Sequence, residues 1–84
     1  MWNIFYSKQA LKDIKKIKNT PLYRKFKELI AIIKIDPYAV NSGFKKLNGF
    51  ENTYSRRLNI QHRLVYKIVK NRLLVEILST WEHY

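Results

Sequence analysis

The first part of the chain changes from a strand-like to a helix-like pattern of apolar residues. The stretch "WNIFYS" at 2–7 is rich in aromatic and β-branched side chains, which predicts a strand over 2–6. Apolar residues then recur at 10, 11, 14 and 17, the spacing of one helix face, with lysines between them. Ser7 is the expected N-cap, so we expect a short amphipathic helix from there to about Asn19.

A second helix is expected directly after the first. Thr20 is a typical N-cap residue, and Pro21 suits the first helical position, where a backbone N–H has no helical partner. Five apolar residues then follow at helical spacing: Leu22, Phe26, Leu29, Ile30 and Ile33. Pro37 should end this helix, because the residue before a proline is disfavoured in helical conformation.

The rest of the chain, after a loop over 36–43, is expected to form sheet. Strand-forming residues cover 44–47, 54–58, 62–70 and 73–81, and turn-forming residues separate these runs. No internal repeat or linker is visible, so residues 1–84 should form one domain. The prediction is an α+β fold in two layers: an N-terminal strand, two helices, and an antiparallel meander, with the helices on one face of a four- or five-stranded sheet.

Positive charge is the feature of the composition that bears most on function. The chain has 17 Lys and Arg against 6 Asp and Glu, a net charge of +11 at pH 7. This exceeds the net charge of about 2 to 8 that serves solubility in a small domain. Nucleic acid is the first candidate partner, because neutralised phosphates release condensed counterions; an acidic protein and a merely solvated basic surface are the alternatives. The chain has no cysteine and shows neither a secretory leader nor a membrane span, so a cytoplasmic protein is expected.

The stretch "YSRRLNIQHRLVY" at 54–66 concentrates positive charge on a predicted hairpin. If residues 59–61 form a three-residue turn, Arg57 lies directly across from Arg63 on one face. Facing cations repel each other, and a bound phosphate removes that cost because guanidinium groups bind its oxygens in pairs. Arg56 should point to the opposite face, into solvent. The pair therefore predicts phosphate binding, with or without catalysis.

Such a pair suits cleavage of RNA by its own 2′-hydroxyl. A base removes the hydroxyl proton, cations stabilise the charge on the phosphorane, and an acid protonates the leaving 5′-oxygen. The carboxylates are scattered singly, so no metal site and no cofactor are expected. His83 is the candidate acid or base, since imidazole titrates near neutrality. A turn centred on Asn71 would pair Arg63 with Ser79 and put His83 on the face of the arginines. His62, beside a turn, should be structural or position the substrate.

Three segments together resemble the YoeB/Txe family of bacterial toxins in the RelE superfamily: "SRR" at 55–57, "HRLVY" at 62–66 and "HY" at 83–84. The resemblance spans essentially the whole chain. It implies a messenger-RNA endonuclease that acts in the ribosomal A site without a metal. It also implies a YefM-type antitoxin with an acidic C-terminal segment, binding of operator DNA only through the antitoxin complex, and a possible homodimer.

The resemblance also implies roles for four residues of this chain. Arg57 and Arg63 contact the phosphate and stabilise the transition state, His83 is the general acid, and Tyr84 positions the substrate. Arg56 is also expected to contact the substrate.

The general base is where this sequence departs from the family. The family has a glutamate two residues before a leucine, and "FKKL" at 44–47 puts Lys45 in that place. Lys45 or Lys46 is one candidate base, with Lys46 otherwise a substrate contact, and Glu51 on the following loop is another. The alternative is a weakened or non-catalytic module that binds RNA or docks the antitoxin. We expect retained activity, because positioning and electrostatic stabilisation survive the loss of one catalytic group.

Overall fold

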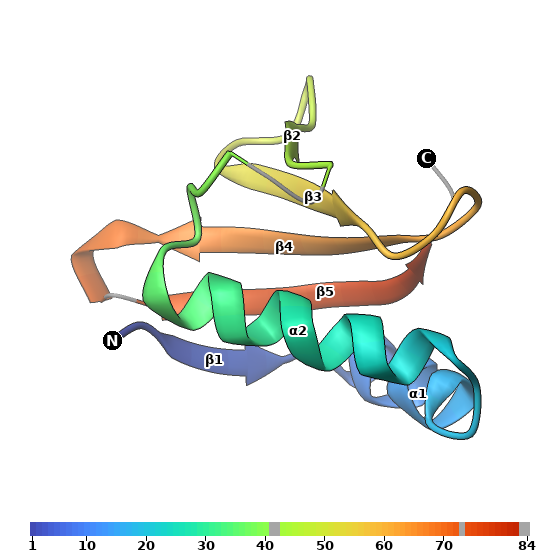
Figure 1. The fold of residues 1–84 in the computed structure, drawn as a ribbon. Helices are drawn as coiled ribbons and strands as arrows, with labels where there is room; N and C mark the ends of the chain where they lie inside the picture. Colours follow the sequence, from blue (N-terminus) through green and yellow to red (C-terminus); the bar gives the residue numbers. More distant parts are fainter. Residues whose placement is uncertain (41–42, 73, 83–84) are drawn as a thin grey trace.

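Five strands form one sheet in the order β1-β5-β4-β3-β2, with two helices packed against it (Figure 1). The computed structural model describes residues 1–40, 43–72 and 74–82. Along the chain the elements are β1 (Asn3–Tyr6), α1 (Lys8–Ile17), α2 (Leu22–Ile35), β2 (Lys45–Lys46), β3 (Thr53–Arg57), β4 (Arg63–Val69), a 3₁₀-helix (Lys70–Arg72) and β5 (Leu74–Glu82). The predicted α+β architecture is confirmed. Within the described ranges neither helix is long and apolar enough to cross a membrane.

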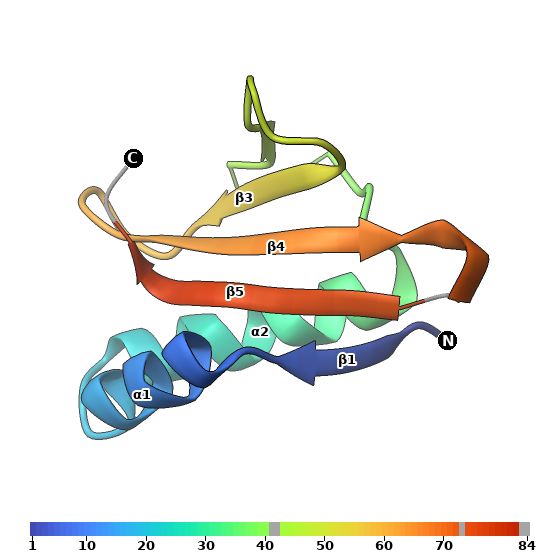
Figure 2. The ribbon, with the colours of Figure 1, turned by 180° about the vertical axis from the view of Figure 1, so that it is seen from behind.

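The sheet is mixed, because its first strand joins it in parallel. β1 pairs with β5 in parallel register, from Asn3 opposite Leu74 to Tyr6 opposite Ile77. The other three pairings are antiparallel, as the meander predicted. α2 lies across one face of the sheet, which Figure 1 shows in front, and Figure 2 shows the opposite face without a helix across it.

The two helix starts differ in how they are capped. Ser7 is the N-cap of α1, as predicted, and its hydroxyl oxygen accepts the Ala10 N–H at 3.0 Å. Pro21, rather than Thr20, occupies the N-cap position of α2. The Thr20 hydroxyl donates to the Ile17 carbonyl oxygen at 2.7 Å and accepts the Leu22 N–H at 3.3 Å, so it links the last turn of α1 to the first residue of α2. α2 ends at Ile35, and its C-cap is Asp36, the residue before Pro37.

One apolar layer between the helices and the sheet forms the core. Its buried members on α2 are the predicted ones apart from Leu22, which packs on the layer from its edge. On α1 the buried positions are Ala10, Asp13 and Ile17, so the prediction that Leu11 belongs to the apolar face is wrong, and its side chain is 51% exposed. Residues 10, 13 and 17 lie on one helix face, and Leu11 is turned about 100° from Ala10. Asp13 takes the buried place and accepts a 2.8 Å hydrogen bond from the Gln9 amide.

The hairpin of β3 and β4 has the predicted register, with Arg57 directly opposite Arg63. Its turn is closed by the His62 carbonyl oxygen, which accepts the backbone N–H groups of Leu58 and Asn59. The Asn59 side-chain oxygen accepts two more, from Gln61 at 2.9 Å and His62 at 2.7 Å. The turn is therefore held from both sides, which fixes the pairing of the two strands.

The predicted register between the last two strands is wrong. Arg63 lies opposite Glu82, and it is Val65 that lies opposite Ser79. Two irregularities, at Arg63/Val65 and Val65/Tyr66, each move the partner of β4 further along β5. As a consequence, the end of β5 reaches the Arg63 end of β4. His83 and Tyr84 follow Glu82 in sequence and lie outside the described residues.

Candidate nucleic-acid interface

The sheet has two chemically different faces, which we call inner and outer. The inner face packs on α2, and the outer face is the one that Figure 2 turns to the reader. Side chains alternate between faces along a strand, so Arg56 lies on the inner face and Ser55 and Arg57 lie on the outer one. Directly opposed residues share a face, which adds Arg63 to the outer face.

Arg57 and Arg63 form a facing pair of cations on the outer face. Burial lowers the pKa of the Arg63 guanidinium, and the charge of Arg57 lowers that pKa further. Both effects make the charged form of Arg63 less favourable in the folded protein. An anion bound between the two guanidinium groups would relieve that cost, and a phosphate matches their donor geometry.

Two contacts hold the Arg63 side chain in place. Its Nε–H donates to the Ser55 hydroxyl oxygen at 2.8 Å, and the Ser55 side chain is fully buried beneath it. One of its terminal nitrogens donates to the carbonyl oxygen of Gly43, in the loop before β2. Arg63 thus connects β4, β3 and that loop across the outer face. The sequence placed Ser55 inside the "SRR" segment, but only the register shows that its hydroxyl meets the arginine of the next strand.

Gly43 passes very close to the other arginine of the pair. A Cβ atom on Gly43 would lie 2.8 Å from the Cβ of Arg57, and the backbone has φ +67°, where only glycine is unstrained. The loop can therefore pack on the arginine pair only with glycine here. Sequence analysis missed this residue, although glycine is rare in the chain, with 2 in all.

The structure brings Lys45 to the arginine pair and turns Lys46 away from it. Lys45 lies opposite Ser55, so it shares the outer face, while Lys46 lies opposite Tyr54, whose ring packs on the core layer. Both lysines are exposed on the short β2. Lys45, Arg57 and Arg63 therefore surround Ser55 from three directions.

Arg56 is not solvated, so that prediction is wrong, and its full burial removes it from the substrate contacts. Its side chain is completely buried, its Nε–H donates to the Tyr66 hydroxyl at 3.0 Å, and Nη2 donates to the Ala39 carbonyl oxygen at 2.7 Å. Its guanidinium lies 4.8 Å from the ring centre of Phe44. The Tyr66 hydroxyl in turn donates to the Pro37 carbonyl oxygen at 2.8 Å. Arg56 ties the loop after α2 to the inner face of the sheet.

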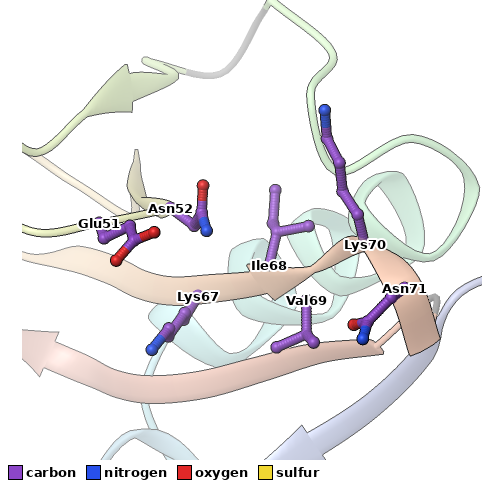
Figure 3. Close-up of a pocket in the computed structure, with 7 residues that line it drawn as sticks. All are labelled: Glu51, Asn52, Lys67, Ile68, Val69, Lys70 and Asn71. Carbon is purple, nitrogen blue, oxygen red and sulfur yellow. The ribbon is translucent and has the colours of Figure 1, made fainter.

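The structure does not bring Glu51 to the pair. Glu51 is exposed and precedes β3, whereas Arg57 ends that strand, and the four steps from Thr53 to Arg57 alone span about 13 Å. Glu51 instead lines a pocket of about 480 Å³ at the opposite end of the hairpin, together with Asn52, Lys67, Ile68, Val69, Lys70 and Asn71 (Figure 3). A role for Glu51 as base would need a movement of this whole turn.

His62 has a structural place in the turn. Its backbone closes the turn on both sides, and its side chain is partly buried just before β4 begins. A substrate-positioning role for its imidazole stays a prediction. Among the described residues, no group of three or more metal-ligating side chains comes together.

Comparison with known proteins gives a consistent result. Residues 6–84 match the family described as the YoeB-like toxin of bacterial type II toxin–antitoxin systems. The chain is similar to the YoeB dimer of Staphylococcus aureus, at 33% identity and a TM-score of 0.84, over 99% of this chain and 98% of that one. A chain of the heterotetrameric YoeB–YefM complex from Staphylococcus aureus is 32% identical, with a TM-score of 0.81, over 100% and 99% of the two chains.

A likeness at lower identity shows the fold alone. The YoeB/ParE toxin from Agrobacterium tumefaciens has a TM-score of 0.88 at 24% identity, over 98% of this chain and 99% of that one. No curated protein sequence matches the chain.

Proposed function

The chain belongs to the family of YoeB-like toxins of type II toxin–antitoxin systems, and we propose that it is an endoribonuclease that cleaves messenger RNA in the ribosomal A site. The observation that carries the proposal is the facing pair of Arg57 and Arg63 on the outer face. Two guanidinium groups held opposite each other repel, and a backbone phosphate is the ligand that makes the arrangement favourable.

The proposed reaction is an in-line attack of the RNA 2′-oxygen on the adjacent phosphorus. A base takes the 2′-hydroxyl proton as the O2′–P bond forms, and an acid protonates O5′ as the P–O5′ bond breaks. The products are a 2′,3′-cyclic phosphate and a 5′-hydroxyl. Arg57 and Arg63 stabilise the charge on the phosphorane, because donors fixed before the reaction need no reorganisation.

Lys45 is the base that the geometry favours, and His83 is the proposed acid. Lys45 shares the outer face with the pair, whereas Lys46 lies on the inner face and Glu51 precedes the far end of β3. His83 directly follows Glu82, whose backbone lies opposite Arg63. Tyr84, the next residue, is proposed to position the RNA.

The partners proposed here follow from the family. Relatives from Staphylococcus aureus form a YoeB dimer and a YoeB–YefM complex. We infer a YefM-type antitoxin for this chain as well, with an acidic segment matching its net charge of +11. Operator DNA would be bound only through that complex, and the ribosome supplies the positioning that a small domain cannot give to its RNA.

A second candidate function is a binding module without catalysis. The observation that favours it is the lysine at position 45, where the family has a glutamate. Such a module would bind RNA or the antitoxin through the same arginines, with an affinity that falls steeply as salt rises.

The test is cleavage mapping in a translation extract. Messenger RNA on ribosomes is incubated with the wild type, His83→Ala, Lys45→Ala and Lys45→Glu, and new 5′ ends are mapped by primer extension. We expect cuts at A-site codons with the wild type, strong loss with His83→Ala and Lys45→Ala, and recovery with Lys45→Glu. Absence of cuts with the wild type would establish the binding module instead. Cutting by His83→Ala equal to that of the wild type would reject the assigned acid, and cutting by Lys45→Ala equal to that of the wild type would reject the assigned base.

A further inference from the structure

A second pocket lies beside the arginine pair and has no role in the mechanism above. Its volume is about 400 Å³, and its lining comes from α2, from the loop before β2 and from the turn between β3 and β4: Lys25, Gly43, Arg57, Leu58, Asn59 and Ile60. This is within the range of pockets that hold small ligands, about 300 to 1,000 Å³. Arg57 is the one residue that the pocket shares with the facing pair.

The lining of the pocket is basic. Lys25 and Arg57 are its two charged residues, and none of the described residues that line it is acidic. Lys25 is partly buried, whereas its neighbours Arg24 and Lys27 on the same helix are exposed. Two cations that converge on one hollow attract an anionic group and keep it there.

The other side of the pocket is apolar, and hydrogen bonds hold the backbone of the turn that forms it. Ile60, at the tip of the turn, is 97% exposed, while Leu58, two residues earlier, is buried. The turn cannot easily fold Ile60 inward, because the Asn59 side chain and the His62 carbonyl oxygen hold its backbone in four hydrogen bonds. An exposed aliphatic side chain on a fixed turn can make an apolar contact with the face of a planar ring.

Gly43 keeps the third wall in position. Its carbonyl oxygen accepts a hydrogen bond from Arg63, and its Cα packs against Arg57 without room for a Cβ. The pocket and the arginine pair thus share one wall, so RNA bound at the pair can extend into the pocket.

We propose that this pocket binds the nucleotide next to the scissile phosphate of single-stranded RNA. Lys25 and Arg57 hold the phosphate of that nucleotide, and Ile60 covers its base. The inference rests on the proposed function, since it takes the phosphate on the arginine pair as the one that is cut. Proteins that hold unpaired strands without reading their sequence usually combine a basic groove with aromatic side chains that stack on the bases, and here the aliphatic side chain of Ile60 takes that place.

The test uses 2′-O-methyl RNA oligomers, which lack the nucleophile and therefore stay intact. Fluorescence anisotropy measures the Kd of a dinucleotide and a tetranucleotide for the wild type, Lys25→Gln and Arg24→Gln. Arg24→Gln is the matched control, because it removes one charge from an exposed neighbour. We expect Lys25→Gln to weaken tetranucleotide binding by roughly 5- to 10-fold and to lower the slope of log Kd against log salt by about 0.7, the value for one phosphate contact. Equal values for the two variants would overturn the proposal.

Ile60→Ser tests the apolar wall separately. Because Ile60 is exposed, the substitution should not affect folding. We expect about 3-fold weaker tetranucleotide binding with an unchanged salt slope. Unchanged binding would show that the base does not contact Ile60.

The outcomes distinguish this inference from the proposed function. If the wild type cuts messenger RNA on ribosomes, but Lys25→Gln and Ile60→Ser bind like Arg24→Gln, the pocket is rejected and the endonuclease stands. If Lys25 is needed for binding but the wild type cuts nothing, the pocket stands and the endonuclease is rejected.

Discussion

Arg56 and Arg57 are neighbours in the chain and belong to two different regions of the molecule. Arg56, on the inner face, is completely buried and donates to a tyrosine hydroxyl and to backbone carbonyl oxygens. Arg57, on the outer face, is exposed and lies opposite another arginine. An arginine side chain therefore stabilises the fold on the inner face, and a second one destabilises it on the outer face. A charge that is costly in the free protein is well placed to bind a ligand.

The largest difference between the two faces is expected when each arginine is replaced by methionine. Arg56→Met leaves the Ala39 carbonyl oxygen and the Tyr66 hydroxyl without this donor inside the protein. We expect a loss of roughly 3–5 kcal/mol in the free energy of unfolding, a large part of the total for a small domain. Arg57→Met should change stability by less than about 0.5 kcal/mol or raise it, since it removes a facing like charge. Urea unfolding followed by circular dichroism measures both, and similar losses would mean that the two faces do not differ in this way.

The opposite result is expected when cleavage is measured. Arg57→Gln and Arg63→Gln each remove a donor to the transition-state phosphorane, so cutting of ribosome-bound messenger RNA should fall by about 10²- to 10³-fold. Folding stability should be unchanged or raised in Arg57→Gln, whereas Arg63→Gln also loses the hydrogen bonds to Ser55 and Gly43 and should lose about 1–2 kcal/mol. Lys67→Gln is the control, because Lys67 is an exposed cation of the outer face at the far end of the hairpin. Equal losses of cleavage in all three variants would indicate a general effect of net charge.

The buried Tyr66 of the inner face should make the free energy of unfolding depend on pH. Burial raises the pKa of Tyr66 from its ordinary value of 10.0 to about 12, although Arg56 opposes the shift. A raised pKa in the folded state means that the neutral phenol contributes stability fully below pH 10, and that this contribution is lost as the pH rises to 12. The loss should be roughly 3 kcal/mol, at about 1.36 kcal/mol per pKa unit. Unfolding in urea at pH 9 to 12 measures it, and Tyr66→Phe should flatten the curve; an unchanged slope in that variant would contradict the assignment.

Sequence analysis predicted the pairing of the arginines but not the environment of Arg56. The facing pair depends only on the length of a three-residue turn, which is a local property of the chain. The burial of Arg56 depends on carbonyl groups of a loop 17 to 19 residues earlier, which no local pattern contains. The predicted register of β5 was wrong for a related reason: two irregularities shift the pairing of β4 with β5, and nothing in the sequence of β4 marks them.

The two glycines test whether the loop before β2 shapes the outer face. Both have positive φ, so replacement by alanine costs about 1–2 kcal/mol at each from backbone strain. Only at Gly43 would the new Cβ also meet Arg57, at 2.8 Å, whereas nothing lies within 4 Å at Gly49. Gly43→Ala should therefore reduce RNA cleavage as well as stability, and Gly49→Ala should reduce stability alone. A cleavage rate that falls equally in both variants would show that the loop contact has no part in the site.

The smallest effect is expected from the hydroxyl beneath the arginine pair. Ser55→Ala removes one hydrogen bond to the Arg63 Nε–H, worth about 0.5–1.5 kcal/mol, and leaves a hole the size of one oxygen atom. Arg63 keeps its contact with Gly43, so the guanidinium stays on the outer face with less restriction of its orientation. Single-turnover cleavage should then slow several-fold while binding of a 2′-O-methyl RNA hardly changes, because orientation matters more in the transition state than in the bound state. Ser55→Thr, which keeps the hydroxyl, should restore the rate if its extra methyl group fits. A fall in binding equal to the fall in rate would mean that Ser55 supports RNA affinity and has no special role in aligning Arg63.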